Sequence, residues 1–399
     1  MKQAEHPAPA RHDGAVDSSD SPPGTSASVA AVATGLPGGA HWAGQAFAGG
    51  NAAGPPAGGG RVPGVALPHG GREGEQACPH ALIVAGPTCS GKSALAMVLA
   101  RKVGGTVINA DSMQVYRDLR VLTARPTPAD EAEVPHCLYG VLPASETGSV
   151  AWWREQALAA MQAAWLDNRL PILCGGTGLY LRALTHGLSL VPPCPDEIRA
   201  AARDLVAREG SHAVHARLAG LDPQMAARLK PEDSQRVTRA WEVWQATGRS
   251  LAWWQAQPGL PPAPCRFSAI RLLPERGVLR TRIAARFEAM LAGGAVEEVQ
   301  ALVARRLDPA LPAMRAHGVP ELAAMLAGDL TREEAARRAI VATGQYTKRQ
   351  ATWFAHHDLA AENLTCTIGA CFSGTNFSDF AQLSERNIEN IVSFISEWG

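Results

Sequence analysis

A glycine-rich segment, GPTCSGKS at residues 86–93, most constrains what this chain can fold into. It matches the pattern G-x-x-x-x-G-K-[ST], which surrounds phosphate groups in P-loop proteins. A short apolar run, ALIVA at 81–85, precedes the segment, and good helix formers follow it at 93–103. The order strand, glycine-rich loop, helix is the context that this motif requires. The sequence therefore predicts an α/β fold with a P-loop NTPase-like parallel sheet flanked by helices.

Each residue type in this loop has a physical role. Gly86 and Gly91 permit backbone angles at which successive N–H groups turn toward an anion, and the following helix adds its positive dipole end. Lys92 supplies a full charge, and Ser93 offers a hydroxyl to a magnesium ion. We expect the diphosphate or nucleotide to contact Gly86, Pro87, Thr88, Cys89, Ser90, Gly91, Lys92 and Ser93. The loop alone does not identify its phosphate, so ATP remains a candidate ligand.

Two further polar segments follow strand candidates. The run TVINA at 106–110 precedes Asp111, and the run PILC at 171–174 precedes a glycine-rich turn that contains Thr177. Ligands of open parallel sheets bind beyond the carboxyl ends of the strands. We therefore expect Asp111 and Thr177 to face the same crevice as Lys92. Asp111 fits a catalytic base, a helix cap or a magnesium-positioning carboxylate.

Beyond about residue 191 the chain becomes helical and rich in arginine. Arg236 and Arg239 lie three residues apart on one predicted helix, where such a pair is either a solvated surface or a second clamp on phosphates. Lys348 and Arg349 alternate with aromatic residues, which fits RNA contact or an ordinary amphipathic helix. We predict helices at 196–208, 232–247, 276–292, 294–306, 318–327 and 331–355, and a strand at 267–273.

Composition restricts the remaining possibilities. Lys plus Arg and Asp plus Glu number 37 each, so the whole-chain charge does not indicate a polyanionic partner. The eight cysteines include no C-x-x-C pair, which argues against a zinc site or a disulfide framework and favours the cytoplasm. No apolar run approaches about 18 residues, so we expect no membrane partner. Residues 1–78 are dominated by small residues and are predicted to be a disordered tail, and residues 357–399 form a C-terminal tail of unknown role.

Together these motifs resemble the tRNA dimethylallyltransferase (tRNA isopentenyltransferase) family. A P-loop that is followed by DSMQVY and then by GGTGLY is highly specific to it. The resemblance implies a catalytic region at 79–356, with a mostly helical insertion at about 119–200 that grips the anticodon stem. The matching segments are GPTCSGKS (86–93), ADSMQVYR (110–117), VPH (134–136), PILCGGTGLYLRAL (171–184), DSQRVTRAWEVWQATGR (233–249), PER (274–276), RFEAMLAGGAVEEV (286–299) and QYTKRQATWF (345–354).

The resemblance implies transfer of a dimethylallyl group from dimethylallyl diphosphate to the exocyclic amine of the adenosine 3′ to the anticodon. The tRNAs would be those that read codons beginning with U, the enzyme would be a monomer, and Mg²⁺ would be its cofactor. Asp111 would be the base, and Lys92 and Ser93, the latter with the magnesium ion, would act on the leaving diphosphate. The implied tRNA-contacting residues are Asp111, Ser112, Met113, Gln114, Thr177, Arg199, Gln235, Arg236, Val237, Thr238 and Arg239.

The chain departs from the family pattern in three segments, at 118–120, at 135–137 and at 314–320, and two other functions remain as alternatives. Where the family has DSMQVYRGMDIGTAKP this chain has DSMQVYRDLRVLTARP, which changes the predicted geometry of the turn at 118–120. An ATP-dependent nucleotide-type kinase would also use Lys92, Ser93 and Asp111, but no lid arginine motif is evident. A non-catalytic RNA-binding protein with a vestigial loop is less consistent with three intact catalytic residue types.

Overall fold

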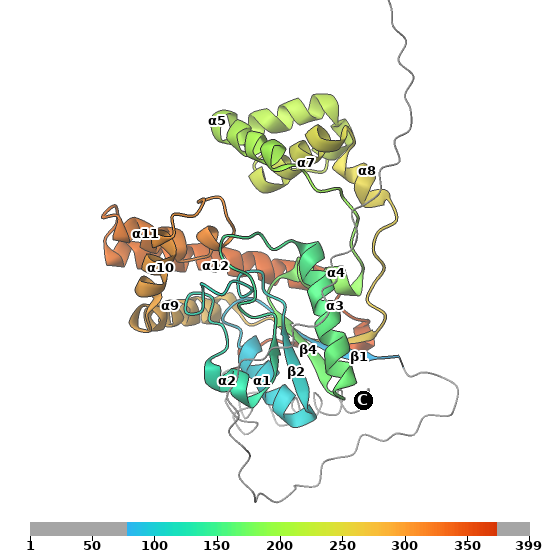
Figure 1. Ribbon diagram of the computed structural model, residues 1–399, viewed down its shortest axis with the longest axis vertical. Helices are drawn as coiled ribbons and strands as arrows, with labels where there is room; N and C mark the ends of the chain where they lie inside the picture. Colours follow the sequence, from blue (N-terminus) through green and yellow to red (C-terminus); the bar gives the residue numbers. More distant parts are fainter. Residues whose placement is uncertain (1–77, 373–399) are drawn as a thin grey trace, which may run out of the picture. The chain divides into compact units, whose positions relative to one another are not determined.

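The computed structural model describes residues 78–372 (Figure 1). The predicted tail at 1–78, apart from Cys78, and residues 373–399 lie outside the described residues. The strands are β1 (His80–Ala85), β2 (Gly105–Asn109), β3 (His136–Cys137), β4 (Leu170–Gly175), β5 (Arg266–Leu272) and β6 (Thr365–Ile368). The helices are α1 (Lys92–Val103), α2 (Pro128–Glu133), α3 (Val150–Leu166), α4 (Gly178–Thr185), α5 (Asp196–Leu221), α6 (Pro223–Ala226), α7 (Ser234–Thr247), α8 (Leu251–Ala256), α9 (Arg276–Ala292), α10 (Ala295–Ala304), α11 (Val319–Leu326) and α12 (Arg332–His356).

The described strands form one parallel sheet in the order β3-β2-β4-β1-β5-β6. The strand that precedes the phosphate loop, β1, lies between β4 and β5, and Leu82 is paired with Ile172 on one side and Ser268 on the other. Because β2, β4 and β1 are neighbours, their carboxyl ends meet at one edge. This arrangement confirms the predicted α/β class with its P-loop NTPase-like sheet.

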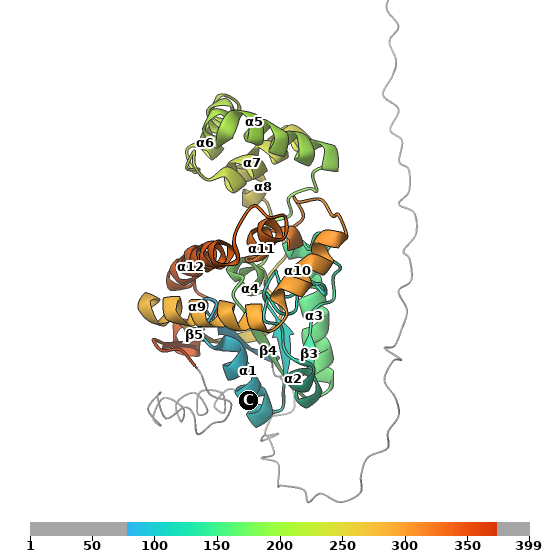
Figure 2. The ribbon, with the colours of Figure 1, turned by 90° about the vertical axis from the view of Figure 1, so that its left-hand side faces the viewer.

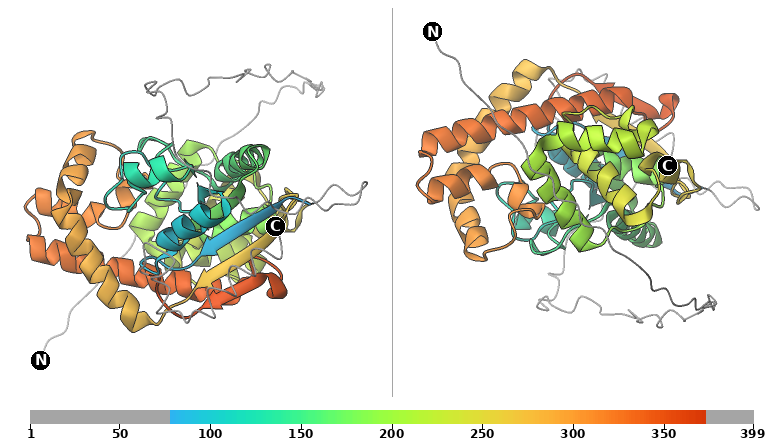
Figure 3. Two further views of the ribbon diagram at one scale, coloured as in Figure 1. Left: turned by 90° about the horizontal axis from the view of Figure 1, so that it is seen from below. Right: turned by 90° about the horizontal axis from the view of Figure 1, so that it is seen from above.

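Two apolar cores lie on the two faces of the sheet, because side chains alternate along each strand. Leu82 and Val84 of β1 belong to the core that α1 covers. Ile83, on the opposite face, belongs to the larger core with residues of α3, α4 and α9 to α12. The view from below shows β1 beside β5, and the view from above shows the long helix α12 (Figure 3). The central strands are therefore enclosed on both faces, as their continuous apolar runs require.

Four helices, α5 to α8, pack on one another around a core of their own (Figure 2). Leu218, Val243 and Leu251 are among its buried side chains. The predicted bounds of the helical insertion, about 119–200, are therefore wrong, because that range contains the central strand β4 and two helices packed on the sheet. The helix predicted at 196–208 also continues to Leu221, with a change of direction at Gly210, whose φ is 82°.

Residues 357–372 belong to the same unit as the sheet, so the predicted start of a separate tail at 357 is wrong for this part. Strand β6 pairs in parallel with β5, and Ala269 lies opposite Thr365. Beyond it, the N–H of Phe372 donates to the carbonyl of Ser90 at 2.9 Å, inside the phosphate loop. None of the helices within 78–372 is long and apolar enough to cross a membrane.

Candidate active site

The phosphate loop joins β1 to α1, and its backbone bends are those of an anion cradle. Gly91 has a φ of 91°, in the left-handed region that favours glycine. A Cβ atom there would lie 1.9 Å from the carbonyl oxygen of Phe372, so the site has no room for a side chain. Cys89 also has a positive φ, 63°, which is uncommon for a residue with a side chain. These bends turn successive N–H groups toward one point.

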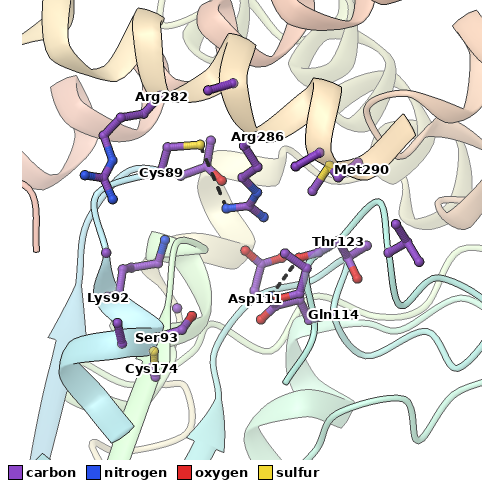
Figure 4. A pocket seen from close by; sticks show the side chains of 18 residues that line it. Cys89, Lys92, Ser93, Asp111, Gln114, Thr123, Cys174, Arg282, Arg286 and Met290 are labelled. Carbon is purple, nitrogen blue, oxygen red and sulfur yellow. Dashed lines mark hydrogen bonds between the residues drawn. The ribbon is translucent and has the colours of Figure 1, made fainter. Parts of the chain in front are cut away.

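Lys92 is the first residue of α1, and its half-buried ammonium points into the cavity beside the loop (Figure 4). Its Nζ donates a hydrogen bond to the carbonyl of Pro87 at 3.1 Å. Desolvation by the surrounding protein lowers the pKa of Lys92, the charge of Asp111 raises it, and that of Arg286 lowers it again. A bound anion would stabilise the charged ammonium, so the site favours a phosphate group.

Two arginines of α9 face Lys92 across this cavity, which has a volume of about 630 Å³ (Figure 4). Arg282 and Arg286 lie four residues apart and so share one face of the helix. Arg286 Nη1 lies 3.9 Å from the sulfur of Cys89, and Arg282 donates to the carbonyl of Phe372 at 3.2 Å. Sequence reasoning missed both residues: their spacing predicts only that they share a helix face, and the packing of α9 against the loop decides what that face meets.

Asp111 follows β2 and lies in the same cavity as Lys92, as predicted. Its N–H donates to Asn109 Oδ1 at 2.8 Å, and its Oδ1 accepts the N–H of Met113 at 2.9 Å. These two bonds fix the turn and the plane of the carboxylate. Among residues 78–372 its Oδ2 receives no hydrogen bond from a donor, which leaves this oxygen available to a ligand.

The residues predicted to contact the flipped nucleotide meet at the ends of β2 and β4. The Ser112 N–H donates to Thr177 Oγ1 at 2.9 Å, and the two hydroxyl oxygens lie 3.3 Å apart. Gln114 Nε2 donates to the carbonyls of Thr123 and Ala124 at 2.8 and 3.1 Å. The structure thus brings Ser112 and Thr177 together, whereas the Gln114 amide holds a loop of the chain.

A smaller cavity of about 80 Å³ adjoins the phosphate cavity, and Asp111 and Arg286 line both. Its wall is largely apolar and also includes His317 and Tyr346, whose rings lie 5.0 Å apart. Burial lowers the pKa of His317, which favours the neutral ring. The apolar side chains that line this cavity are Met113, Leu122, Ile283, Phe287, Met290 and Ala316.

Gln350 of α12 ties the phosphate loop to the loop after β4, and sequence reasoning missed it. Its side chain is buried, with Oε1 accepting the Thr88 N–H and Nε2 donating to the Gly176 carbonyl, both at 2.9 Å. Its neighbours Lys348 and Arg349 are exposed. The final helix therefore has a packing role at Gln350, and the proposed RNA contact by its basic residues stays a prediction.

The tRNA-contacting residues predicted on α5 and α7 lie away from the phosphate cavity. Arg199 and Arg239 line a separate cavity of about 940 Å³ together with Arg182 and His186. Arg199 pairs with Asp196, and Arg239 lies 3.2 Å from Glu242 on its own helix. The two arginines thus share a concave surface, whereas the arginines next to the phosphate loop come from α9.

The rest of the predicted run on α7 has mixed exposure. Gln235 and Arg236 are exposed, and Arg236 lies 3.5 Å from Asp233. Thr238 donates its hydroxyl hydrogen to the carbonyl of Ser234 at 2.7 Å. Val237 has no exposed surface, so its side chain is not available to tRNA, and the predicted contact of this residue stays untested. Its position on the inner face of an amphipathic helix explains the difference.

Family models match most of the described chain. The model described as IPP transferase matches residues 114–357, and the model described as isopentenyl transferase matches residues 79–136. A tRNA dimethylallyltransferase of Gluconacetobacter diazotrophicus is 63% identical over 314 residues, which are 79% of this chain and 93% of that relative. The corresponding enzyme of Gluconobacter oxydans is 60% identical over 317 residues, with coverage of 79% and 94%.

Solved structures are similar as well. The tRNA isopentenylpyrophosphate transferase of Bacillus halodurans superposes with a TM-score of 0.54 at 30% identity, covering 80% of this chain and 97% of the other. A eukaryotic dimethylallyltransferase that was captured acting on tRNA gives a TM-score of 0.63 at 25% identity, with 80% of each chain covered. These likenesses extend over both the sheet and the helical regions.

Proposed function

Because the chain belongs to the tRNA dimethylallyltransferase family, and is thus a prenyltransferase that modifies tRNA, we propose that its two adjoining cavities hold the two reacting groups. Dimethylallyl diphosphate is the donor, and the exocyclic amine of the adenosine 3′ to the anticodon is the acceptor. The tRNAs are those that read codons beginning with U. We also propose that the enzyme acts as a monomer in the cytoplasm.

One observation carries this proposal: cationic groups and an available carboxylate line the same cavity. Lys92 points into the cavity from the side of the phosphate loop, Arg286 points into it from α9, and Asp111 lies below Arg286 (Figure 4). During transfer the amine nitrogen forms a bond to the terminal allylic carbon while the bond from that carbon to the diphosphate oxygen breaks. Lys92, Arg286 and the N–H groups of the loop stabilise the negative charge that develops on the leaving diphosphate.

Asp111 takes the proton that the amine loses. Its Oδ1 is held by the Met113 N–H, so Oδ2 is the oxygen that accepts a hydrogen bond from the amine and then its proton. Ser112 and Thr177, which are hydrogen-bonded to each other, contact the flipped base next to Asp111. Flipping is required because the amine cannot reach Asp111 while the base remains stacked in the anticodon loop.

The residues at the loop fit a magnesium ion that is shared with the donor. Within residues 78–372 no group of three or more His, Cys, Asp or Glu side chains could hold a metal on its own. The Ser93 hydroxyl and the Asp111 carboxylate line the same cavity, and oxygen ligands with several waters suit Mg²⁺. Ser93 and the diphosphate oxygens would hold the ion, which would neutralise charge on the leaving group.

The smaller cavity suits the five-carbon group of the donor. Leu122, Phe287 and Met290 give it an apolar wall directly beside the phosphate cavity. Burial of apolar surface there stabilises the bound tail by about 25 cal/mol per Å² of area removed from water. A γ-phosphate group would gain nothing from this wall, whereas an apolar prenyl tail would be stabilised by it, which supports a prenyl donor.

We propose that the helices α5 to α8 contact the anticodon stem. Arg199 and Arg239 line a cavity that is also lined by Arg182 of α4. Positive charge from these helices and from a helix packed on the sheet therefore lines the same cavity. Guanidinium groups bind phosphate oxygens in pairs and supply most of the sequence-independent affinity for RNA. The exposed Gln235 and Arg236 extend this surface along α7.

The proposal is tested by incubating the full-length protein, Mg²⁺ and an anticodon stem-loop RNA with a labelled donor. The expected result is transfer of label from dimethylallyl diphosphate to the RNA and none from γ-labelled ATP. A matched RNA with guanosine in place of the target adenosine should remain unlabelled. Transfer from ATP alone would establish a kinase instead, and absence of transfer from either donor would leave a binding protein.

A further inference from the structure

Glu298 of α10 binds the backbone of a distant loop through its carboxylate. Its Oε2 accepts the N–H groups of Arg120 and Val121 at 2.6 and 2.7 Å, and its Oε1 accepts the N–H of Leu122 at 3.0 Å. Three successive N–H groups that converge on one point form the kind of concavity that usually binds a free anion. Here a side chain 176 residues away along the chain from Leu122 supplies the anion.

The loop that Glu298 binds forms one wall of both cavities. Val121, Thr123 and Ala124 line the phosphate cavity, and Leu122 and Thr123 line the apolar one. Gln114 holds the same loop from the other side, by donating to the carbonyls of Thr123 and Ala124. Glu298 binds its N–H groups and Gln114 its carbonyls, so the backbone of this wall is fixed at both ends.

The contact of Glu298 with the loop at 120–124 also connects this loop to the helix that carries Arg282 and Arg286. Helix α10 follows α9 directly and packs on it, and α9 carries Arg282 and Arg286. The loop is therefore fixed relative to the helix that faces the phosphate loop. Hydrogen bonds from N–H groups to a carboxylate are among the stronger ones available to a protein, so this link is well suited to set the width of the donor site.

We propose that Glu298 is a positioning residue for the prenyl donor, which it serves by fixing the loop at 120–124 at the distance from α9 that the diphosphate and its tail require. This inference rests on the proposed function. Glu298 touches neither substrate. Its partners are backbone groups of the loop, and the guanidinium of Arg120 pairs with Glu131 instead. The carboxylate thus acts on the position of the wall and on no charged side chain of the site.

The neighbouring residue Glu297 provides a matched control. It has the same side chain and lies in the same turn of α10, but it is exposed. Glu297→Ala removes the same number of atoms and the same charge near the helix N-terminus. Any effect of Glu298→Ala beyond that of Glu297→Ala therefore reports the contact with the loop.

The test is steady-state kinetics of the full-length protein with dimethylallyl diphosphate and stem-loop RNA. We expect Glu298→Ala to lower kcat/KM for the donor about 100-fold, mainly through KM, because misplacement by about 1 Å can have that effect. Glu298→Gln can still accept two of the three N–H bonds and should lose about tenfold. RNA affinity in all variants and the kinetics of Glu297→Ala should stay within about twofold of wild type.

Three outcomes would overturn the inference. Both Glu298 variants could show wild-type kinetics, or their RNA affinity could fall by the same factor as their kcat/KM for the donor. The third outcome is a lower fraction of active enzyme with unchanged kinetics per active molecule. If Glu298→Ala does not fold, Glu298→Gln carries the same test. An inactive wild-type protein would contradict the proposed function itself, so the two failures are distinguishable.

Discussion

Two regions of this molecule carry arginines that we propose bind phosphate groups, and the arginines of the two regions are held in different ways. Arg282 and Arg286 of α9 lie in a cavity beside the phosphate loop and contact distant parts of the chain, the Phe372 carbonyl and the Cys89 sulfur. Arg199 pairs with Asp196, three residues away on the same helix. Arg239 pairs with the buried Glu242 on its own helix and also donates to the sulfur of Cys194 at 3.1 Å. Arg282 and Arg286 are thus held by distant parts of the chain, whereas Arg199 is held by a local ion pair and Arg239 by one local and one distant contact.

The difference fits the ligands that we propose for the two regions. The ion pair of Arg199 with the exposed Asp196 is weak in water, so an RNA phosphate can replace it at little cost. A small diphosphate must be held in one orientation relative to the attacking amine, which requires groups that do not rearrange. Substitutions in the cavity should therefore affect chemistry and donor binding, whereas substitutions on α5 and α7 should affect RNA affinity.

The largest effect is expected for Asp111→Asn. Loss of the base should lower kcat by about 10³-fold or more, because general-base catalysis contributes about 10²–10⁴. RNA affinity, measured by filter binding or fluorescence anisotropy, should stay within about threefold, since no contact to an RNA phosphate is removed. Near-normal turnover would show that Asp111 is not the base, and a parallel loss of RNA binding would contradict the separation of the two regions.

The next effect concerns the α9 arginines. Arg286→Ala should lower kcat/KM for dimethylallyl diphosphate about 100-fold, because a charged donor to the leaving group is lost. Arg280→Ala, an exposed substitution on the same helix, is the control and should have no measurable effect. If the two variants behaved alike, Arg286 would belong with the surface arginines of α5 and α7.

A smaller effect is expected for Arg199→Ala and Arg239→Ala. Each should weaken RNA binding by about three- to tenfold and reduce the slope of log affinity against log salt by less than about 1, with kcat at saturating RNA unchanged. Arg101→Ala, on the helix that covers the other face of the sheet, is the control. A fall in kcat at saturating RNA would show that these arginines also order the catalytic site.

The smallest expected effect concerns the pH dependence of stability, which tests whether His317 in the smaller cavity is shielded from water. Burial lowers the pKa of His317 below its usual 6.5, the charges of Glu321 and Asp111 raise it, and that of Arg349 lowers it. The unfolded chain thus binds this proton first as the pH falls, so the folded state loses stability below about pH 6.5. His317→Gln should flatten this decline in thermal melts between pH 7 and pH 5. A profile identical to that of wild type and of the exposed-site control His212→Gln would mean that His317 is solvated.

The sequence predicted the part of the site that local patterns encode. The phosphate loop, Asp111 and Thr177 each follow an apolar strand, and neighbouring parallel strands bring such residues to one edge. Arg282, Arg286 and Gln350 were missed because their roles depend on how α9 and α12 pack against the loop, which no local pattern specifies. Gln350 lies 262 residues from Thr88, whose N–H it binds.

The same limit applies to the fold. Most strands and helices were predicted within a few residues, because their apolar periodicity is clear. The extent of the helical insertion was wrong, since α3 and α5 are both amphipathic helices and only the packed structure shows that Met161 faces the sheet core whereas Leu218 faces α7 and α8. Strand β6 was missed because TCTI at an exposed sheet edge is too short and too polar to stand out.

The position of Phe372 and Gln350 against the phosphate loop has a consequence for the synthesis of this protein. A ribosome that adds about 5–20 residues per second needs tens of seconds to extend the chain from Thr88 to Gln350. During that time the loop lacks the side chain that fixes Thr88, and Ser90 still lacks its partner at Phe372. The newly made chain therefore acquires the complete hydrogen bonding of its phosphate loop only after Gln350 and Phe372 have been synthesised, when the helices α5 to α8 have already emerged.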